Sequence, residues 1–265
     1  MPASTAAPSN DPATVIAVGV LASTLAATCH ETVGHGLGCV GAGGHVTLLT
    51  SIWFRCQGAP DISYVGGPLG NLLAGSAALA ALRYTQAGAR VRLFWLLFGT
   101  INLFWFTGQL IYESLTNAQD DWYYFIAAQI GGTAIRRGVG ATVGIGGYLF
   151  VTRAVTAIIR QRGGPQGSAI RLAYAAAVAA ALIAGLLWRP EPFRSAFEEF
   201  LTLGVAPLGL LNIARNANHN VGMDGGASSV ARSWLWIAAS VVALGVFLLV
   251  QAPGLGPLAT SRLTQ

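Results

Sequence analysis

Long hydrophobic runs separated by short polar connections make up most of the chain. Runs of this length cross a hydrocarbon core of about 30 Å, so they indicate an all-α polytopic membrane protein with about six to seven transmembrane helices. The predicted spans are Ala13–Leu37, Gly67–Leu82, Leu93–Leu115, Val139–Ile159, Leu172–Trp188 and Trp234–Val250. A further segment, Phe200–Ile213, is short and contains Pro207, so it is predicted either to cross or to form a re-entrant or interfacial segment.

Composition supports a multi-pass membrane protein. Hydrophobic residues make up 54% and charged residues 9% of the chain, with a mean hydropathy of +0.58. Soluble chains carry about 25% charged residues. The net charge of +5 comes from arginine and none from lysine, and the arginines lie mostly in connections. This pattern indicates anchors at lipid headgroups rather than a nucleic-acid site. We expect the lipid bilayer as partner and the inner membrane of a bacterium as location.

The domain organisation follows from the same pattern. Residues 1–12 are rich in Ala, Ser and Pro and are predicted to form a disordered tail. Residues 13–251 form a single transmembrane domain, and residues 252–265 form a C-terminal tail. Between the first two spans, a glycine-led segment ending in His45–Phe54 predicts a short β-strand or hairpin, with an anchored interfacial loop as the alternative.

Polar residues at the end of the first span carry the candidate chemistry. His30, Glu31 and His35 follow an otherwise apolar run. Ionisable residues in a bilayer are expensive, costing about 2.5–3.5 kcal/mol each near its centre, so a group of them indicates binding. Neutral imidazoles bind Zn²⁺, and an adjacent Glu is suited to accept a proton from water. A metal-free hydrogen-bonded cluster is the alternative.

Three motifs in order resemble the site-2 protease family of intramembrane zinc metalloproteases. They are His30-Glu31-Thr32-Val33-Gly34-His35, the segment Gly66-Gly67-Pro68-Leu69-Gly70-Asn71, and Asp120-Asp121-Trp122 after the third span. The resemblance covers residues 13–137, and residues 138–251 are additional helices. It implies a zinc-dependent metalloendopeptidase acting on transmembrane or membrane-adjacent peptides. A non-catalytic membrane protein that uses this scaffold for binding or metal handling is the alternative function.

The resemblance also implies residue roles. His30, His35 and an Asp would hold zinc, with Glu31 as general base. Asn71 would steady substrate backbone or a developing oxyanion, although its neighbouring small residues also serve close helix packing.

The histidine spacing departs from the family. The family's histidines are four residues apart, whereas His30 and His35 are five apart, which is about 140° around a regular α-helix. A π-bulge would absorb the extra residue, and Gly34 and Gly36 favour that distortion. Without it, the two side chains diverge.

Topology selects the third ligand. We define face A as the side of the N-terminal tail and face B as the side on which the first span ends. Asp121 then lies on the face of the histidines, with Asp120 beside it. Asp224, near His219, is the alternative, and it returns to face B only if Phe200–Ile213 does not cross. Gln109 and Glu113, four residues apart in the third span, are predicted to line a polar cleft or to pair with an arginine.

The cysteines and the distribution of arginines lead to two further expectations. Cys29, Cys39 and Cys56 are too few and too irregular for a disulfide framework and are interpreted as small apolar filler. Arginines near span ends favour face A in the cytoplasm, whereas the first span and the resembling family favour face B there. On this second ground we expect face B inside.

Overall fold

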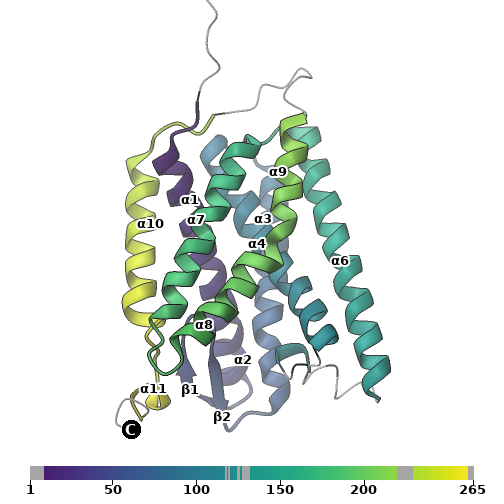
Figure 1. Cartoon of the computed structure of the whole chain (residues 1–265), viewed down its shortest axis with the longest axis vertical. Coiled ribbons are helices and arrows are strands. Elements are labelled where there is room, and N and C mark those ends of the chain that lie inside the picture. Colours follow the sequence, from purple (N-terminus) through teal and green to yellow (C-terminus); the bar gives the residue numbers. More distant parts are fainter. Residues whose placement is uncertain are drawn as a thin grey trace, which may run out of the picture.

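A computed structural model describes residues 9–116, 118, 120–123, 126, 132–219 and 229–261 (Figure 1). Seven helical segments in this part of the chain are long and apolar enough to cross a membrane, which confirms the predicted fold class. They are Pro12–Gly41, Asp61–Tyr84, Ala89–Thr116, Thr133–Arg162, Gly167–Leu186, Pro192–Ala217 and Trp234–Gln251.

The helices form one bundle. Its long elements are α1 (Pro12–Thr28), α3 (Gly66–Tyr84), α4 (Ala89–Thr116), α6 (Thr133–Arg162), α7 (Gly167–Leu186) and α10 (Trp234–Val246). Helix α1 packs against α4, α7 and α10, and α4 packs against α3 and α6. Buried side chains such as Val15, Leu97, Phe104 and Ile170 form the core between them. The two central helices, α1 and α4, therefore hold most of the bundle together.

Local signals set the start of α1. Asp11 is its N-cap and accepts a hydrogen bond from the Thr14 backbone N–H at 2.9 Å, and Pro12 occupies the first turn. Asn10 in turn donates to the Gln166 side chain at 2.8 Å. Residues 9–11 of the predicted N-terminal tail are thus tied to the bundle, while residues 1–8 lie outside the described residues.

The segment Phe200–Ile213 belongs to a helical path that crosses the bundle. Helix α8 (Pro192–Glu199), the π-helical turn Phe200–Val205 and α9 (Gly209–His219) follow one another from face B to face A (Figure 1). Pro207 has a non-helical ψ of 16° and marks a kink. The helical path continues beyond this kink along the length of the bundle, which favours a crossing over a re-entrant or interfacial segment.

A hairpin follows the first span, as predicted. Strands β1 (His45–Leu49) and β2 (Phe54–Gln57) pair antiparallel, with His45 opposite Gln57 and Leu49 opposite Phe54. Leu49 also bridges Leu255, which fixes part of the predicted C-terminal tail beside the hairpin. That tail continues into the short helix α11 (Pro257–Ser261).

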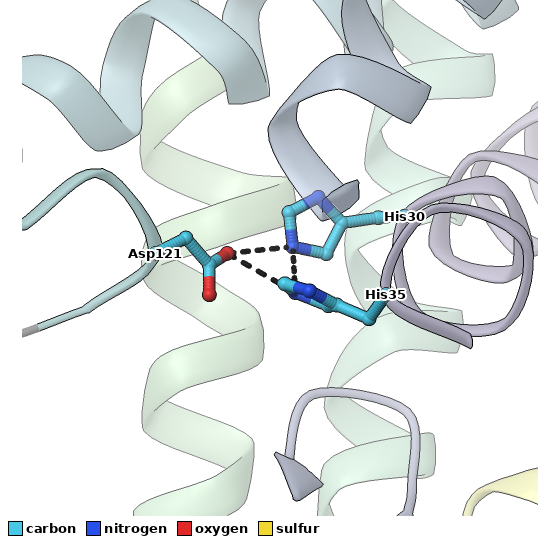
Figure 2. A group of neighbouring side chains, drawn as sticks. All are labelled: His30, His35 and Asp121. Carbon is cyan, nitrogen blue, oxygen red and sulfur yellow. Dashed lines mark hydrogen bonds and ion pairs between the residues drawn. The ribbon is translucent and has the colours of Figure 1, made fainter. Parts of the chain in front are cut away.

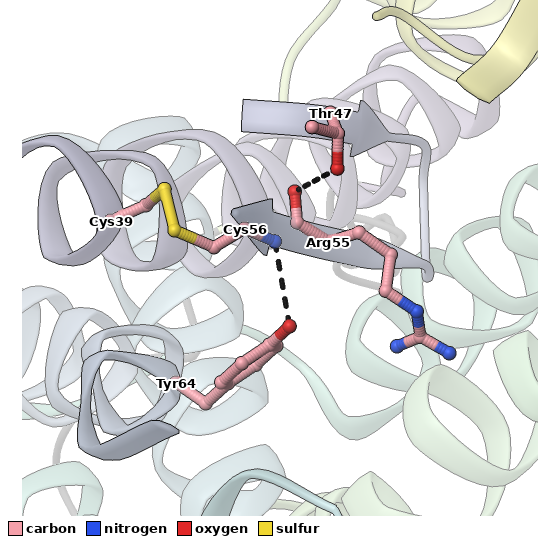
Figure 3. Close-up of a disulfide and its surroundings, with 5 residues drawn as sticks. All are labelled: Cys39, Thr47, Arg55, Cys56 and Tyr64. Carbon is pink, nitrogen blue, oxygen red and sulfur yellow. Dashed lines mark hydrogen bonds between the residues drawn. A yellow bond between two sulfur atoms is a disulfide. The ribbon is translucent and has the colours of Figure 1, made fainter. Parts of the chain in front are cut away.

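The interpretation of all three cysteines as filler is wrong. Cys39, in helix α2 (Gly36–Gly41), forms a disulfide with Cys56 of β2, their Cα atoms 5.8 Å apart (Figure 3). The Cys56 backbone N–H also contacts the Tyr64 hydroxyl at 3.4 Å. The two cysteines are 17 positions apart in sequence, so only the return of the hairpin brings them together. Cys29 is free.

The disulfide indicates which face of the protein lies outside the cytoplasm. Disulfides persist in oxidising compartments and are rare in the cytosol. The pair lies on face B, and the arginine excess near span ends lies on face A, so both observations favour face A in the cytoplasm. They oppose the first-span argument, and we now expect face B on the oxidising side.

Labelling in intact cells tests this orientation. Single cysteines replace Ala87, between α3 and α4 on face A, and Arg189, between α7 and α8 on face B, in a Cys29→Ala background that keeps the disulfide. An impermeant maleimide should label only the Arg189→Cys protein before lysis and both proteins afterwards. The reverse pattern would place face B in the cytoplasm.

Candidate metal centre

A π-helical segment, Cys29–His35, brings the two histidines together. The Gly36 backbone N–H donates to the Glu31 carbonyl five residues earlier, which is the hydrogen bond of a π-turn. The wider turn brings residues five apart onto one face. Figure 2 shows both imidazoles pointing the same way from this segment, so the predicted distortion is confirmed.

Asp121 completes a compact group of three. Asp121 Oδ2 lies 3.1 Å from His30 Nε2 and 3.1 Å from His35 Nε2, and the two Nε2 atoms are 3.1 Å apart (Figure 2). All three side chains are buried. Asp121 comes from the helical turn after α4, so residues ninety-one positions apart converge. The predicted histidines and the preferred third ligand therefore meet at one place.

No arrangement of protons satisfies all three contacts. Asp121 Oδ2 can accept from both imidazoles only if both Nε2 atoms carry hydrogens, which then face each other. If one Nε2 atom lacks its hydrogen, the lone pair of that nitrogen faces the carboxylate oxygen, and the two repel each other. A cation held between the three atoms removes the conflict, because every lone pair then points at positive charge. These donor atoms are of the kinds that bind zinc.

Neighbouring polar side chains hold the ligands. Asn71 Nδ2 lies 3.0 Å from His30 Nδ1, and Gln109 Nε2 donates to Asp121 Oδ2 at 2.9 Å. The Asn71 Oδ1 atom is buried and has no hydrogen-bond partner within the described part of the chain, and the opposite amide orientation would let Oδ1 accept from Nδ1–H. Protonation at Nδ1 leaves Nε2 free to bind a cation. Asn71 thus contacts a ligand, and its predicted contact with substrate stays a prediction.

Gln109 and Glu113 lie at different distances from the centre: Gln109 contacts Asp121 directly, whereas Glu113 contacts the backbone of the next residue. Glu113 accepts a hydrogen bond from the Trp122 backbone N–H at 3.2 Å, which fixes the turn that carries Asp121. Neither side chain pairs with an arginine in the part of the chain that the structure describes.

Aromatic rings enclose both imidazoles. Trp105 of α4 stacks on His30 with centroids 4.2 Å apart, and Phe54 of β2 stacks on His35 at 4.9 Å. Tyr64 meets His35 edge-on at 6.1 Å. Stacking holds each ring in one orientation, and the apolar surroundings strengthen electrostatic interactions at the nitrogens. No sequence pattern predicted these contacts, because the three rings come from three separate elements.

Gly67, which precedes the Pro-x-x-Asn motif, lies so close to the two imidazoles that no side chain fits there. A Cβ atom at this position would lie 2.4 Å from His35 Nε2 and 2.8 Å from His30 Nε2. Gly34 and Gly66 likewise meet backbone to backbone, since a Cβ at Gly34 would lie 2.5 Å from the Gly66 carbonyl oxygen. The glycines therefore let the start of α3 approach the ligand atoms directly.

The acidic residues have different positions. Glu31 is buried, and its Oε2 atom has no hydrogen-bond partner among the described residues. Burial by itself raises the pKa of Asp121, but the imidazoles of His35 and His30 outweigh burial and hold that pKa below its usual value. Asp120 is exposed and is not one of the three ligands. Asp224 lies outside the described residues.

Comparisons with protein-family models, with curated proteins and with solved structures find no match. The resemblance to site-2 proteases consequently depends on the three motifs and their order in the chain.

The packing at Gly67 generates a prediction. Gly67→Ala should reduce metal affinity by roughly 10–100-fold, the usual range when a ligand's surroundings are disturbed. The stacked imidazoles cannot move aside without leaving Phe54 and Trp105. Competition with a chromogenic chelator measures the affinity.

Gly36→Ala is the matched control, because the nearest atom to a Cβ there is 4.0 Å away. Equal affinities for the two variants would contradict the assignment of Gly67 to the centre.

Proposed function

We propose that the protein is an intramembrane zinc metalloprotease of the site-2 type, which hydrolyses peptide bonds of membrane or membrane-adjacent substrates. The observation that carries the proposal is the buried triangle of His30, His35 and Asp121 donor atoms, each 3.1 Å from the other two. Glu31, next to the first ligand in sequence, supplies the remaining group that this chemistry needs.

The donor set fits zinc. Ligands at 2.0–2.1 Å in a tetrahedral site lie about 3.3 Å from one another, close to the separations here. Two imidazoles and one carboxylate leave a fourth position open, as in catalytic rather than structural zinc sites. Zinc bound there would lower the pKa of a water molecule and polarise a carbonyl oxygen.

Glu31 is suited to carry the proton. Its unpartnered Oε2 atom would accept a proton from the attacking water and return it to the nitrogen of the leaving amine. His30 and His35 keep their orientation through Trp105 and Phe54 during this exchange. Their surroundings are preorganised, so little rearrangement is needed during reaction.

The hairpin offers a place for an extended substrate. The outer edge of β1 pairs with Leu255 at Leu49, whereas the Cys56 N–H of β2 points away from β1 to a tyrosine hydroxyl. A peptide that adds to the β2 edge gains backbone hydrogen bonds without sequence preference. Phe54 of the same strand contacts His35, so the added strand would run past the metal centre.

Metal analysis tests the centre. Protein purified with zinc should retain about one ion per chain, and His30→Ala or His35→Ala should release it. Asp121→Asn should weaken retention, because amides bind zinc poorly compared with carboxylates. Mass spectrometry of dialysed protein gives the zinc content.

Asp120→Asn is the control, since the exposed neighbour lies outside the triangle, and it should keep its zinc. Stronger loss in Asp224→Asn than in Asp121→Asn would transfer the third-ligand role. Full zinc retention in the double histidine variant would remove the metal centre altogether.

Proteolysis tests the chemistry. Glu31→Gln should keep zinc and fold but lose about 10²–10⁴-fold in kcat, because the amide cannot accept the proton. The assay uses proteoliposomes and a panel of quenched fluorescent peptides that carry an apolar transmembrane segment.

Glu191→Gln, the same change on the protein surface, should leave turnover unchanged. Unchanged turnover in Glu31→Gln would assign the proton transfer to another group. A zinc-loaded wild-type protein that cleaves no peptide of the panel would favour the non-catalytic scaffold.

A further inference from the structure

A polar groove lies between α6 and α9, away from the metal centre. Its volume is about 420 Å³. The polar residues that line it include Arg153, Arg160, Gln161, Asn212 and Asn216, and none of the lining residues that the structure describes is acidic. Both helices end on face A (Figure 1), and the lining residues of α6 lie in its last three turns, so the groove lies near that side of the membrane.

Arg153 lies deeper than an ordinary headgroup anchor. Helix α6 has 30 residues and is about 45 Å long, which exceeds the hydrocarbon core by about 15 Å. Arg153 lies nine positions before its last residue, about 13.5 Å along the axis, and so falls within the core when the helix is centred. An arginine at that depth needs a polar partner.

The described residues of the protein supply no acidic partner for Arg153. In the part of the chain that the structure describes, neither Arg153 nor Arg160 forms an ion pair with an acidic side chain. The two arginines are seven residues apart, so they lie on one face of α6 about 10.5 Å apart along its axis. Asn212 and Asn216, four residues apart on α9, face the same groove. Two guanidinium groups and several amides therefore line one groove, with no acidic side chain among the described residues that line it.

The surfaces of both helices below the groove, toward the membrane centre, are apolar. One turn below Arg153, Leu149 and Phe150 are exposed, and Phe150 exposes 71% of its surface. One turn below Asn212, Leu208 is exposed as well. Along both helices, arginines and amides near the headgroups are thus followed by apolar side chains toward the membrane centre. An amphipathic ligand that lies along the helices would match this order.

We propose that this groove binds the phosphate group of an anionic phospholipid from the face A leaflet. Guanidinium groups bind phosphate through paired charge-assisted hydrogen bonds, and asparagine amides add further donors. The acyl chains would lie on Phe150 and Leu208. A soluble phosphate shares the headgroup chemistry but gains nothing from the apolar wall. The site is independent of the proposed proteolysis.

Binding of short-chain lipids tests the proposal. Full-length protein in neutral detergent is titrated with dihexanoyl phosphatidylglycerol, with dihexanoyl phosphatidylcholine and with glycerol phosphate, and binding is followed by thermophoresis. The anionic lipid should bind at least about tenfold more tightly than either other ligand. Arg153→Gln with Arg160→Gln should weaken that binding by at least about tenfold, as expected for lost charge-assisted hydrogen bonds.

Two further variants separate charge from folding. Arg153→Lys keeps the charge and should retain more affinity than Arg153→Gln. Arg171→Gln removes an exposed arginine of α7 that does not line the groove, and it should leave binding unchanged. Equal affinity for both lipids, or no effect of the double variant, would overturn the site. Glycerol phosphate binding as tightly as the anionic lipid would assign the groove to a soluble phosphate and overturn the lipid.

Discussion

One wide helical turn positions the whole candidate centre. In a regular α-helix His30 and His35 would diverge by about 140°, and no single ion could reach both. The π-helical turn Cys29–His35 closes that angle while keeping the backbone hydrogen-bonded, as a membrane interior requires. The π-turn thus lets two histidines five residues apart face one site, as two histidines four residues apart do in a regular α-helix.

Backbone contact between glycines holds this turn in place. Gly34 lies against Gly66 and Gly67 so closely that no side chain fits between them. The start of α3 therefore reaches the imidazole nitrogens, and Asn71, one turn further along α3, reaches His30 Nδ1. The disulfide ties α2, which continues the same helical path, to β2, and β2 carries the ring that stacks on His35. Ligands, orienting groups and hairpin consequently form one connected unit.

The two faces of the molecule differ chemically. Face B carries the metal centre, the hairpin and the disulfide, whereas face A carries most arginines and the groove between α6 and α9. If face B is on the oxidising side, the candidate protease opens away from the cytoplasm, unlike the usual arrangement in the family it resembles. A substrate of the proposed protease would then reach the centre from the extracytoplasmic side, beside the outer edge of β2.

The sequence alone predicted six of the membrane spans, the hairpin and the three residues that meet in the candidate metal centre. Apolar length and a glycine-led β-branched segment are local properties, and topology placed Asp121 on the same face as the histidines. The five-residue spacing even indicated the π-turn, because only that distortion lets both rings meet. Tertiary structure decided what depends on distant contacts: whether Pro207 ends a crossing, that Cys39 meets Cys56, and that Trp105, Phe54 and Gln109 surround the ligands. No local pattern encodes these contacts, since each joins elements that the chain brings together only after the helices have packed.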